Sequence, residues 1–471
     1  MLSKHTHLSR KTLGIFFTLI LVCSLASSVL TYELVRAQGG LTAQTISGGP
    51  YAGAPSYTIF KDGTTYYAKD AYGAISYSST DWSTTTQNCV TALVSSGGTI
   101  VFGLMNAPVS ATVYYTENII FKGQVTSDDT GQIGTSFYRT GDFPIFNSTG
   151  AACRHVAWEN IRFSGAEKTN GWTTALIEVP TGTSQTIFES CSFVNSGGAG
   201  INLAGTSYDS SIINCQGQSL TGALVQKITP STGTMVHIEK CIVTYGGLLA
   251  DLYGVIGVNI IGSGGNDFDG GFLKLSSCTG TVQGVDIEGS ATGMNGNAIW
   301  IVGGSLEIVG NRLWRTGNST YSYASFTLTG SSNTRLSSNT VAAGFGYDVS
   351  FAGDSEYYTV EGNDFGRPIG GYAGKVNISM RYNAGYQTYT SFSGLVANNG
   401  VITFPFTLTV KPNIITVSCM NGTYGGVPVV VNPLYNDVVT DTTRVRLALF
   451  WSNGTAITDT LLVSGFAEYK P

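Results

Sequence analysis

A short pattern of apolar and polar positions recurs along residues 156–365. Relative to a reference position that most copies fill with Cys or Asn, apolar residues tend to lie at −5, −3 and +2, with polar residues at −4 and −2. This alternation has the period of a β-strand with one buried face. The reference positions of the eight copies are Ile161, Cys191, Cys215, Cys241, Cys278, Asn311, Asn339 and Asn363.

The spacing of the copies predicts stacked coils. Successive reference positions are 24 to 37 residues apart, and a recurring strand at so irregular a period indicates coils joined by loops of variable length. A small residue that turns inward at the end of each strand makes a ladder, in which Asn side chains can bond each other and Cys acts as a small buried hydrophobe. We therefore expect Leu275, Ile308, Leu336 and Val360 to share one core.

The pattern resembles the right-handed parallel β-helix of the pectin-lyase-like superfamily, over about residues 56–385. The resemblance implies an all-β fold. It does not choose an activity, because that fold hosts lyases, hydrolases, adhesins and phage tailspikes.

The beginning of the coil region predicts a cap. Residues 57–68 form a predicted hairpin with an Asp-Gly turn, and Asp81 or Ser83 can cap a helix over 81–94 before a strand over 95–102. This order looks like the start of pectate-lyase-type β-helices, including those related to glycoside hydrolase family 28, and of exported archaeal surface proteins. The helix would cover the open end of the first coil.

The pattern changes after residue 385. Residues 386–400 are predicted to be a connection, and the strands from Val401 onward, separated by Pro, Asn-Gly and Asp-rich turns, suit an antiparallel β-sandwich. This part looks like the C-terminal domains of tailspikes and surface β-helix proteins. The predicted organisation is a cap and first coil over 56–120, a parallel β-helix over 121–385 and a C-terminal β-sandwich domain over 386–471.

The N-terminus predicts export. Lys4, Arg10 and Lys11 precede an apolar run over 13–30, and small residues precede a cleavage point after Ala37. Residues 1–37 are therefore a signal peptide or an uncleaved signal anchor, and 38–55 a linker. We expect the chain to be extracellular, secreted or anchored at the cell surface, with membrane contact only through this segment if it is uncleaved.

Amino-acid composition and net charge limit the classes of partner that the chain can bind. Gly is 61 of 471 residues and charged residues are 11%, against an average of about 25%, which suits stacked strands with Gly-rich turns. Without residues 1–37 the basic count falls from 24 by four and the acidic count from 29 by one, so 20 basic and 28 acidic residues leave a net charge of −8. This balance argues against nucleic acid as a partner.

The cysteines and histidines supply no obvious catalytic site. Cysteine side chains in the ladder are predicted to point in the same direction, which does not suit the geometry of a disulfide, so we expect reduced, buried thiols. The sequence has no Cys-x-x-Cys motif, so a zinc site is not expected. Only His155 and His237 lie beyond the N-terminal segment. The Gly-His-Gly and Arg-Ile-Lys motifs of polygalacturonase-type hydrolases are absent, so that active site is not carried over.

Carboxylates are the remaining candidates for chemistry. Asp267 and Asp269, like Asp286 and Glu288, are two residues apart and so share one side of a strand. Counted from the reference positions, Asp251, Asp286 and Glu288 are predicted to share an outward strip, with Asp348 farther along it. Paired acids suit acid–base work on a glycosidic bond or a Ca²⁺ site of the pectate lyase kind. The bland alternatives are a turn at 266–271 and a solvated surface.

The predicted roles follow from this strip. Asp251, Asp286 and Glu288 are catalytic candidates, Asp348 and Lys274 substrate-binding candidates, and Asp267 and Asp269 metal candidates, with Ca²⁺ as the one cofactor considered. The first hypothesis is an exported protein that binds a polysaccharide or a surface glycan. In one form of this hypothesis the protein also cleaves the glycan, as a lyase or a glycoside hydrolase. The alternative is a non-catalytic adhesin, receptor-binding spike or envelope component. Either could be a homotrimer.

Overall fold

The computed structural model confirms an all-β chain built on a parallel β-helix. It describes residues 55–124, 134–148, 153–166, 170–266, 271–289, 297–315, 324–342, 345–365, 369–371, 375, 377–384, 389–405, 408, 411–419, 423–424, 427–434 and 436–468. The predicted signal segment over 1–37 and nearly all of the predicted linker lie outside these residues. None of the described helices is long and apolar enough to cross a membrane.

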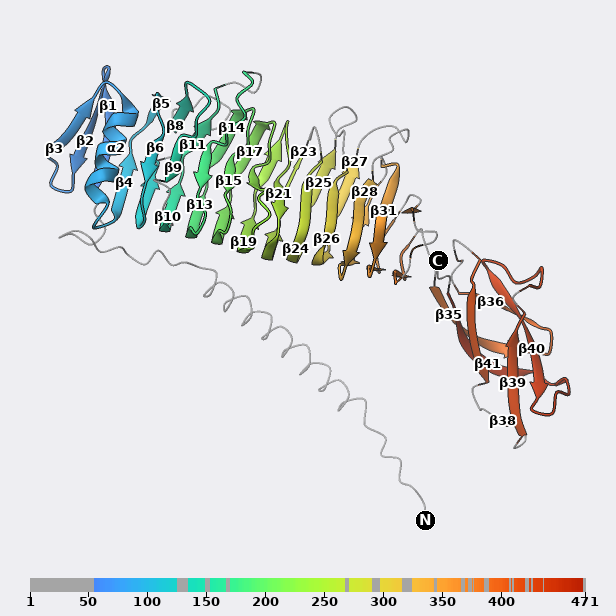
Figure 1. Ribbon diagram of the computed structural model, residues 1–471. Coiled ribbons are helices and arrows are strands. Elements are labelled where there is room, and N and C mark those ends of the chain that lie inside the picture. Colours follow the sequence, from blue (N-terminus) through green and yellow to red (C-terminus); the bar gives the residue numbers. More distant parts are fainter. Residues whose placement is uncertain are drawn as a thin grey trace, which may run out of the picture. The chain divides into compact units, whose positions relative to one another are not determined.

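The coils have three faces, and Figure 1 shows their strands stacked side by side. Face 1 consists of β6 (Val113–Tyr115), β9 (Phe146–Ser148), β12 (Ile177–Val179), β15 (Ile201–Leu203), β18 (Val225–Lys227), β21 (Ala250–Tyr253), β33 (Ile369–Gly370) and the first parts of β24 (Leu273–Gln283), β26 (Ile299–Val309), β28 (Ala324–Ser332) and β31 (Tyr347–Glu356). Each strand pairs in parallel with its equivalent in the next coil.

Face 2 follows face 1 along each coil. It consists of β4 (Gly98–Phe102), β7 (Ile119–Lys122), β10 (Arg154–Glu159), β13 (Ser184–Glu189), β16 (Tyr208–Ile213), β19 (Gly233–Glu239), β22 (Val255–Ile261), the second parts of β24 and β26, β29 (Arg335–Ser337), β32 (Thr359–Glu361) and β34 (Ser379–Arg381). The long strands β24 and β26 run through both faces, so faces 1 and 2 form one sheet.

Face 3 is a separate parallel sheet. Its strands are β5 (Met105–Val109), β8 (Thr135–Arg139), β11 (Arg162–Ser164), β14 (Ser192–Ser196), β17 (Gln216–Leu220), β20 (Ile242–Thr244), β23 (Gly264–Asn266), β25 (Asp286–Gly289), β27 (Arg312–Arg315) and β30 (Thr340–Val341).

A single left-handed residue turns the chain from face 2 to face 3. Its φ lies between 52° and 65° in ten successive coils. The ten residues are Asn160, Ser190, Asn214, Lys240, Gly262, Gly284, Gly310, Ser338, Gly362 and Tyr382. Gly and Asn adopt this conformation at low cost, and their frequency here follows from the turn.

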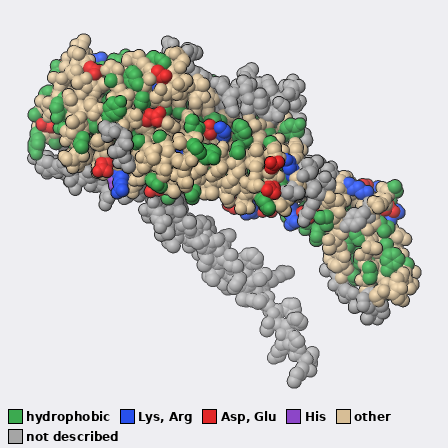
Figure 2. All heavy atoms as spheres, viewed as in Figure 1, with side chains coloured by type: hydrophobic (Ala, Val, Ile, Leu, Met, Phe, Trp, Pro, Cys, Tyr) green, Lys and Arg blue, Asp and Glu red, His purple; other side chains and the backbone are tan. Residues whose placement is uncertain are grey.

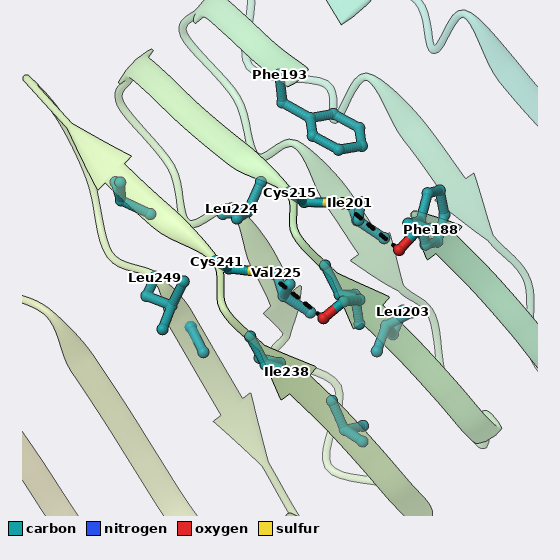
Figure 3. Close-up of a cluster of buried hydrophobic side chains, with 14 of the residues drawn as sticks. Phe188, Phe193, Ile201, Leu203, Cys215, Leu224, Val225, Ile238, Cys241 and Leu249 are labelled. Atoms are coloured by element: carbon teal, nitrogen blue, oxygen red, sulfur yellow. Dashed lines mark hydrogen bonds between the residues drawn. The ribbon is translucent and has the colours of Figure 1, made fainter. Parts of the chain in front are cut away.

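The ladder directly after this turn is confirmed, with one error of register. The side-chain amide of Asn311 donates to Asn339 at 2.9 Å, Asn339 to Asn363 at 2.9 Å, and Asn363 to Asn383 at 2.8 Å. Cys215 and Cys241 occupy the same column and point into the core, where their thiols donate to the carbonyls of Phe188 and Ile212 (Figure 3). No disulfide joins the cysteines in the described part of the chain.

Cys278 does not belong to this column, contrary to the prediction. Its strand β24 pairs with β21 through Leu275 and Leu252, so Leu273-Lys-Leu275 is a face 1 segment. The column instead passes from Cys241 through Ser263 and Val285 to Asn311, as the parallel pairing of the preceding strands requires. Two coils between Cys241 and Asn311 were therefore missed, because Ser263 and Val285 are neither Cys nor Asn, and the last ladder position, Asn383, was not predicted either. Leu275 still shares one core with Ile308, Leu336 and Val360, as predicted.

The N-terminal cap is confirmed. β1 (Tyr57–Asp62) and β2 (Thr65–Asp70) form the predicted hairpin, and β3 (Ile75–Ser79) extends it. Helix α2 (Trp82–Leu93) begins at Asp81, whose carboxylate accepts hydrogen bonds from the backbone of Ser83 and Thr84. The fully buried Trp82 packs on Phe137 with ring centroids 4.3 Å apart, so the helix covers the core of the first coils.

The C-terminal strands form two antiparallel sheets around their own core. One holds β35 (Tyr389–Val396), β41 (Leu461–Glu468) and β37 (Ile414–Cys419), and the other β36 (Val401–Thr403), β40 (Arg444–Trp451), β39 (Val427–Pro433) and β38 (Thr423–Tyr424). Residues from both sheets, among them Phe392 and Leu447, make one hydrophobic cluster. β35 lies where a connection over 386–400 was predicted, and its Ser, Thr and Gly content explains that error.

Candidate functional site

The structure separates the predicted catalytic residues. Asp251 lies on face 1 in β21, whereas Asp286 and Glu288 lie on face 3 in β25. They therefore do not share the predicted outward strip. The prediction counted residues from Cys241 and from Cys278, and these two cysteines occupy different columns, so equal counts lead to different faces.

Of the predicted substrate-binding residues, Lys274 is outward on face 1 beside Asp251, but Asp348 is buried in β31. Asp348 is completely inaccessible to solvent, so it cannot extend an outward strip. The predicted metal candidates Asp267 and Asp269 lie outside the described residues. Within the described part of the chain, no three His, Cys, Asp or Glu side chains group to hold a metal ion.

One column of polar side chains runs along the middle of face 1. It consists of Glu178, Asn202, Gln226, Asp251, Lys274 and Trp300, which we call the face 1 strip. Their neighbours in each strand point inward and are apolar, as in Ile177-Glu-Val179, except for the buried Lys227 next to Gln226. The first five side chains are half-buried and Trp300 is 39% exposed.

The strip residues interact along the helix axis. Asn202 donates to the Glu178 carboxylate at 2.7 Å, and Lys274 approaches Asp251 at 3.4 Å and the Trp300 ring centroid at 5.6 Å. Burial raises the pKa of the Glu178 carboxyl above its usual value, and the hydrogen bond from Asn202 opposes this shift. Raised carboxyl pKa values are frequent in binding and catalytic sites.

The strip has hydrogen-bonding capacity to spare. Gln226 makes no side-chain hydrogen bond within the described part of the chain, although its amide carries two donors and an acceptor. Successive side chains are one strand spacing apart, about 4.8 Å. The strip therefore offers a regular row of amide, carboxylate, ammonium and indole groups to an elongated ligand.

The two strip carboxylates are too far apart to act as a glycosidase pair. Glu178 and Asp251 are three strands apart, which is about 14 Å at the usual strand spacing. Acid and base in glycosidases are about 5–9.5 Å apart. This arrangement can bind a sugar chain but does not by itself supply two-carboxylate hydrolysis.

The other predicted acids line a hollow of about 410 Å³ on face 3, which we call the face 3 hollow. Its lining includes Ile242, Thr244, Gly264, Gly265, Asn266, Asp286, Glu288, Arg312 and Trp314. Asp286 forms an ion pair with Arg312 at 3.6 Å, and the Arg312 guanidinium lies 5.6 Å from the centroid of the Trp314 ring.

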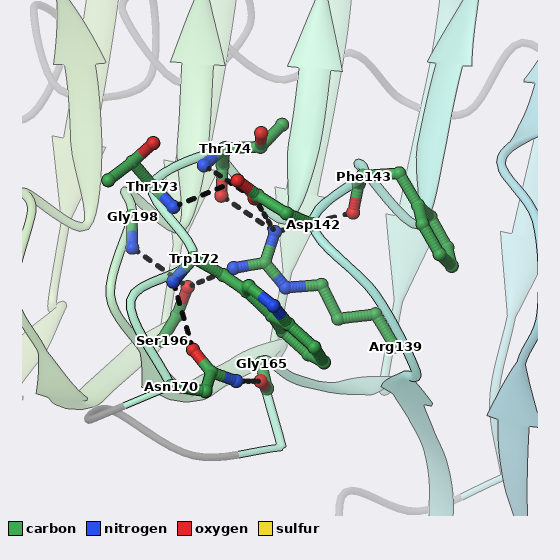
Figure 4. Close-up of polar contacts among 10 residues, drawn as sticks. All are labelled: Arg139, Asp142, Phe143, Gly165, Asn170, Trp172, Thr173, Thr174, Ser196 and Gly198. Atoms are coloured by element: carbon green, nitrogen blue, oxygen red, sulfur yellow. Dashed lines mark hydrogen bonds and ion pairs between the residues drawn. The ribbon is translucent and has the colours of Figure 1, made fainter.

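A buried arginine fixes the connections that lead from face 3 into face 1. Arg139 points from β8 into the chain, where its guanidinium donates to the Thr174 carbonyl at 2.8 Å, the Phe143 carbonyl at 3.3 Å and the Ser196 hydroxyl at 3.2 Å (Figure 4). These partners lie in the connections from β8 to β9 and from β11 to β12 and at the end of β14. The cluster therefore ties three successive coils together.

Asp142 and Trp172 complete the Arg139 cluster. Burial disfavours the charged Asp142 carboxylate, but hydrogen bonds from Thr174 and Thr173 and the nearby Arg139 together hold its pKa below the usual value. Trp172 lies against the guanidinium, 5.4 Å from ring centroid to carbon. Sequence reasoning missed this cluster, although Arg139 follows Thr135 and Phe137 at inward positions of one strand.

A further hollow, of about 660 Å³, lies on the C-terminal sheets. Its described lining is hydroxyl-bearing and apolar and carries no charged side chain. It therefore offers no acid or base for catalysis. In the view of Figure 2, charged side chains are likewise few and scattered among polar and apolar ones.

Sequence reasoning also missed most of the face 1 strip. The signal was a second repeat, a triplet with apolar residues on both sides of a polar or aromatic one, centred 10 to 15 residues after the ladder position. It occurs as Ile201-Asn-Leu203, Ala250-Asp-Leu252, Leu273-Lys-Leu275 and Ile299-Trp-Ile301. One of these triplets was assigned to the first repeat, and the others are short enough to escape notice.

Comparison with known proteins supports the fold and leaves the activity open. No protein-family profile and no curated protein sequence matches the chain. Among solved structures, the A-module of Azotobacter vinelandii mannuronan C-5 epimerase AlgE6 matches with a TM-score of 0.50 at 15% identity, over 64% of this chain and 95% of that one.

Two other solved structures are more distant. The Streptococcus pneumoniae surface protein and adhesin PfbA matches with a TM-score of 0.41 at 11% identity, over 64% of this chain and 96% of that one. The tailspike gp49 of Acinetobacter baumannii bacteriophage Fri1, a capsular polysaccharide depolymerase, matches with a TM-score of 0.36 at 12% identity, over 83% of each chain. The chain has a parallel β-helix fold, which the epimerase A-module shares.

Proposed function

We propose that this chain is an exported protein that binds a neutral polysaccharide lengthwise along the face 1 strip. The observation that carries the proposal is the unbroken column of six hydrogen-bonding or aromatic side chains on consecutive coils, from Glu178 to Trp300. A polysaccharide repeats its hydroxyl groups along one direction, as the strip repeats its donors and acceptors. Trp300 offers an apolar face to a sugar ring.

A comparison with face 2 supports the choice of face 1. The outward column of face 2 satisfies its own charges, since Arg335 bridges Glu307 and Glu361, and His237 contacts both Asn259 and Glu239. The face 1 strip leaves the Gln226 amide unused. Polar groups that are half-buried and unused by the protein are the ones that a ligand can take up.

The charge of the strip favours a neutral glycan. Glu178 and Asp251 contribute two carboxylates against the single ammonium of Lys274, so a polyuronate would meet net repulsion. The mannuronan epimerase module shares the fold, and at 15% identity it supports nothing more specific than a parallel β-helix. The spacing of Glu178 and Asp251 favours binding without cleavage, and hence the adhesin-like alternative over a hydrolase that works on this strip.

The test is binding of the full chain to a panel of neutral and uronate polysaccharides, with release of reducing ends measured in parallel. The double variant Gln226→Ala, Trp300→Ala should bind the preferred neutral glycan at least about tenfold more weakly, since it loses an amide and an indole contact. Glu189→Gln, an exposed change on face 2, is the matched control and should bind as the wild type does. Undiminished binding by the double variant, or binding to uronates alone, would contradict the proposal.

A further inference from the structure

We infer that the face 3 hollow is a second, separate glycan site that takes one neutral hexopyranose ring. It shares no residue with the face 1 strip, and the argument for it is independent of that strip.

The hollow exists because one coil lacks an outward side chain at Gly264 on face 3. β23 carries Gly264-Gly265 where β20 carries Ile242-Val243 and β25 carries Asp286-Ile287. A Cβ on Gly264 would lie 2.5 Å from the Asp286 carbonyl oxygen, so the close approach of the two backbones requires glycine. Ile242 and Asp286 are thus separated by two strand spacings, about 9.6 Å, with bare backbone between them.

The walls supply the groups that bind sugars. Trp314 on β27 and Ile242, which is 52% exposed, give apolar surface on opposite sides. Arg312 lies against the Trp314 indole and so helps to hold it in place. A volume of about 410 Å³ falls within the usual range for small-molecule sites, about 300–1,000 Å³.

Unused hydrogen-bond acceptors also face this region. Glu288 makes no ion pair within the described part of the chain, and only Asp286 is paired, with Arg312. Carboxylates of this kind accept hydrogen bonds from the hydroxyl groups of a sugar.

The charge of the hollow selects against anionic sugars. Asp286 and Glu288 outnumber Arg312, so a uronate or sulfated ring would meet a net negative charge. A neutral ring can place its CH groups on Trp314 and its hydroxyls on the Asp286 and Glu288 carboxylates. With the strip also occupied, the chain would be bivalent for glycans.

The experiment follows the indole N–H signals of the full chain labelled with ¹⁵N-tryptophan, with Trp314→Phe and Trp300→Phe used to assign two signals. The probes are the methyl pyranosides of glucose, galactose, mannose and N-acetylglucosamine, with methyl glucuronoside as the anionic comparison. At least one neutral probe should shift the Trp314 signal saturably. The double variant Asp286→Asn, Glu288→Gln should bind that probe at least fivefold more weakly. The variant Glu189→Gln should bind it with the wild-type affinity.

The wild-type titration decides the question even if a variant folds poorly. If no neutral probe shifts the Trp314 signal saturably, or if the glucuronoside binds as tightly as the neutral probes, the inference is wrong. An unchanged affinity in a folded Asp286→Asn, Glu288→Gln variant would also overturn it. A probe that shifts only the Trp300 signal would contradict a glycan site in the face 3 hollow, while remaining consistent with the proposal for the face 1 strip.

Discussion

At the scale of single residues, the ladder column shows how one position accepts three chemistries. Cys241, Ser263 and Asn311 occupy successive parts of the same column, and each uses its side chain to bond main-chain or side-chain groups of a neighbouring coil. Asn makes the most bonds, because its amide both donates and accepts. Where the column residue is polar, its side chain therefore bonds between coils, while Ile161 and Val285 fill the same slot as buried hydrophobes.

Asn339→Ala tests the Asn part of the ladder. Its side chain donates to the Ile308 carbonyl and to Asn363, and accepts from the backbone and side chain of Asn311. Alanine would leave several buried groups unpaired, so we expect a loss of about 2–4 kcal/mol in unfolding free energy, measured by denaturant titration. The exposed change Asn106→Ala should stay within about 0.5 kcal/mol of the wild type. A similar small effect for both would contradict the ladder.

Cys241→Ser should be milder than the sequence suggests. The pattern alone implies a buried hydroxyl without a partner and a cost of about 1–3 kcal/mol. In the structure the Cys241 thiol donates to the carbonyls of Ile212 and Glu239, and the next coil already carries Ser263 in this slot, donating to Ile261. We therefore expect about 1 kcal/mol or less by the same titration. A loss above about 2 kcal/mol would show that the hydroxyl finds no partner.

Glu178→Gln should raise the melting temperature at pH 7 and have little effect at pH 4. Burial raises the pKa of the Glu178 carboxyl in the folded protein. Its contribution to stability is therefore present below the ordinary Glu pKa of about 4.3 and is lost as the pH rises through the folded value. Gln stays neutral and keeps the oxygen that accepts from Asn202. The exposed Glu189→Gln is the control, and an equal effect at both pH values would contradict burial as the cause.

At the scale of elements, the turns between faces determine the path of each coil. Between faces 2 and 3 the left-handed turn is filled by Gly262, Gly284, Gly310 and Gly362 in four coils. A Cβ on Gly262, Gly310 or Gly362 would meet open space. Only the backbone conformation, and no close contact, therefore selects glycine at these three corners.

The variants Gly310→Val and Gly310→Asn distinguish a constraint on the backbone conformation from a constraint on side-chain volume. Valine at φ 65° is strained, and we expect a loss of about 1–2 kcal/mol, whereas asparagine tolerates this conformation and should cost less than about 1 kcal/mol. Denaturant titration of both variants measures the difference. Equal losses would show that side-chain volume, not φ, is the constraint.

The elements that the sequence predicted correctly are those with local signals. Helix α2 has a capping Asp81 and an apolar face, and the ladder strands have strict alternation around Cys and Asn. β35 was missed because its polar residues resemble a loop, and Cys278 was misplaced because register depends on pairing between coils. The same register error put Asp251 and Asp286 on one strip, so the site was predicted less well than the fold.

At the scale of the whole molecule, the repeated coil turns a local triplet into a continuous surface. One outward residue per strand is a small signal, but parallel pairing in register aligns Glu178, Asn202, Gln226 and Asp251 into a row. Face 2 uses the same alignment to pair its own charges, as between Glu307 and Arg335. In the proposed function, the outward side chains of face 2 stabilise the fold, and those of face 1 bind a ligand.

The most direct test of this account is hydroxyl-radical footprinting of the full chain, with and without the polysaccharide that it binds best. We expect protection of Trp300 and of the exposed Tyr253 near the strip. Tyr357, which is exposed in a connection, and Met235, which is exposed on face 2, should not change. Protection that leaves Trp300 as reactive as in the free protein would place the glycan elsewhere and contradict the central claim.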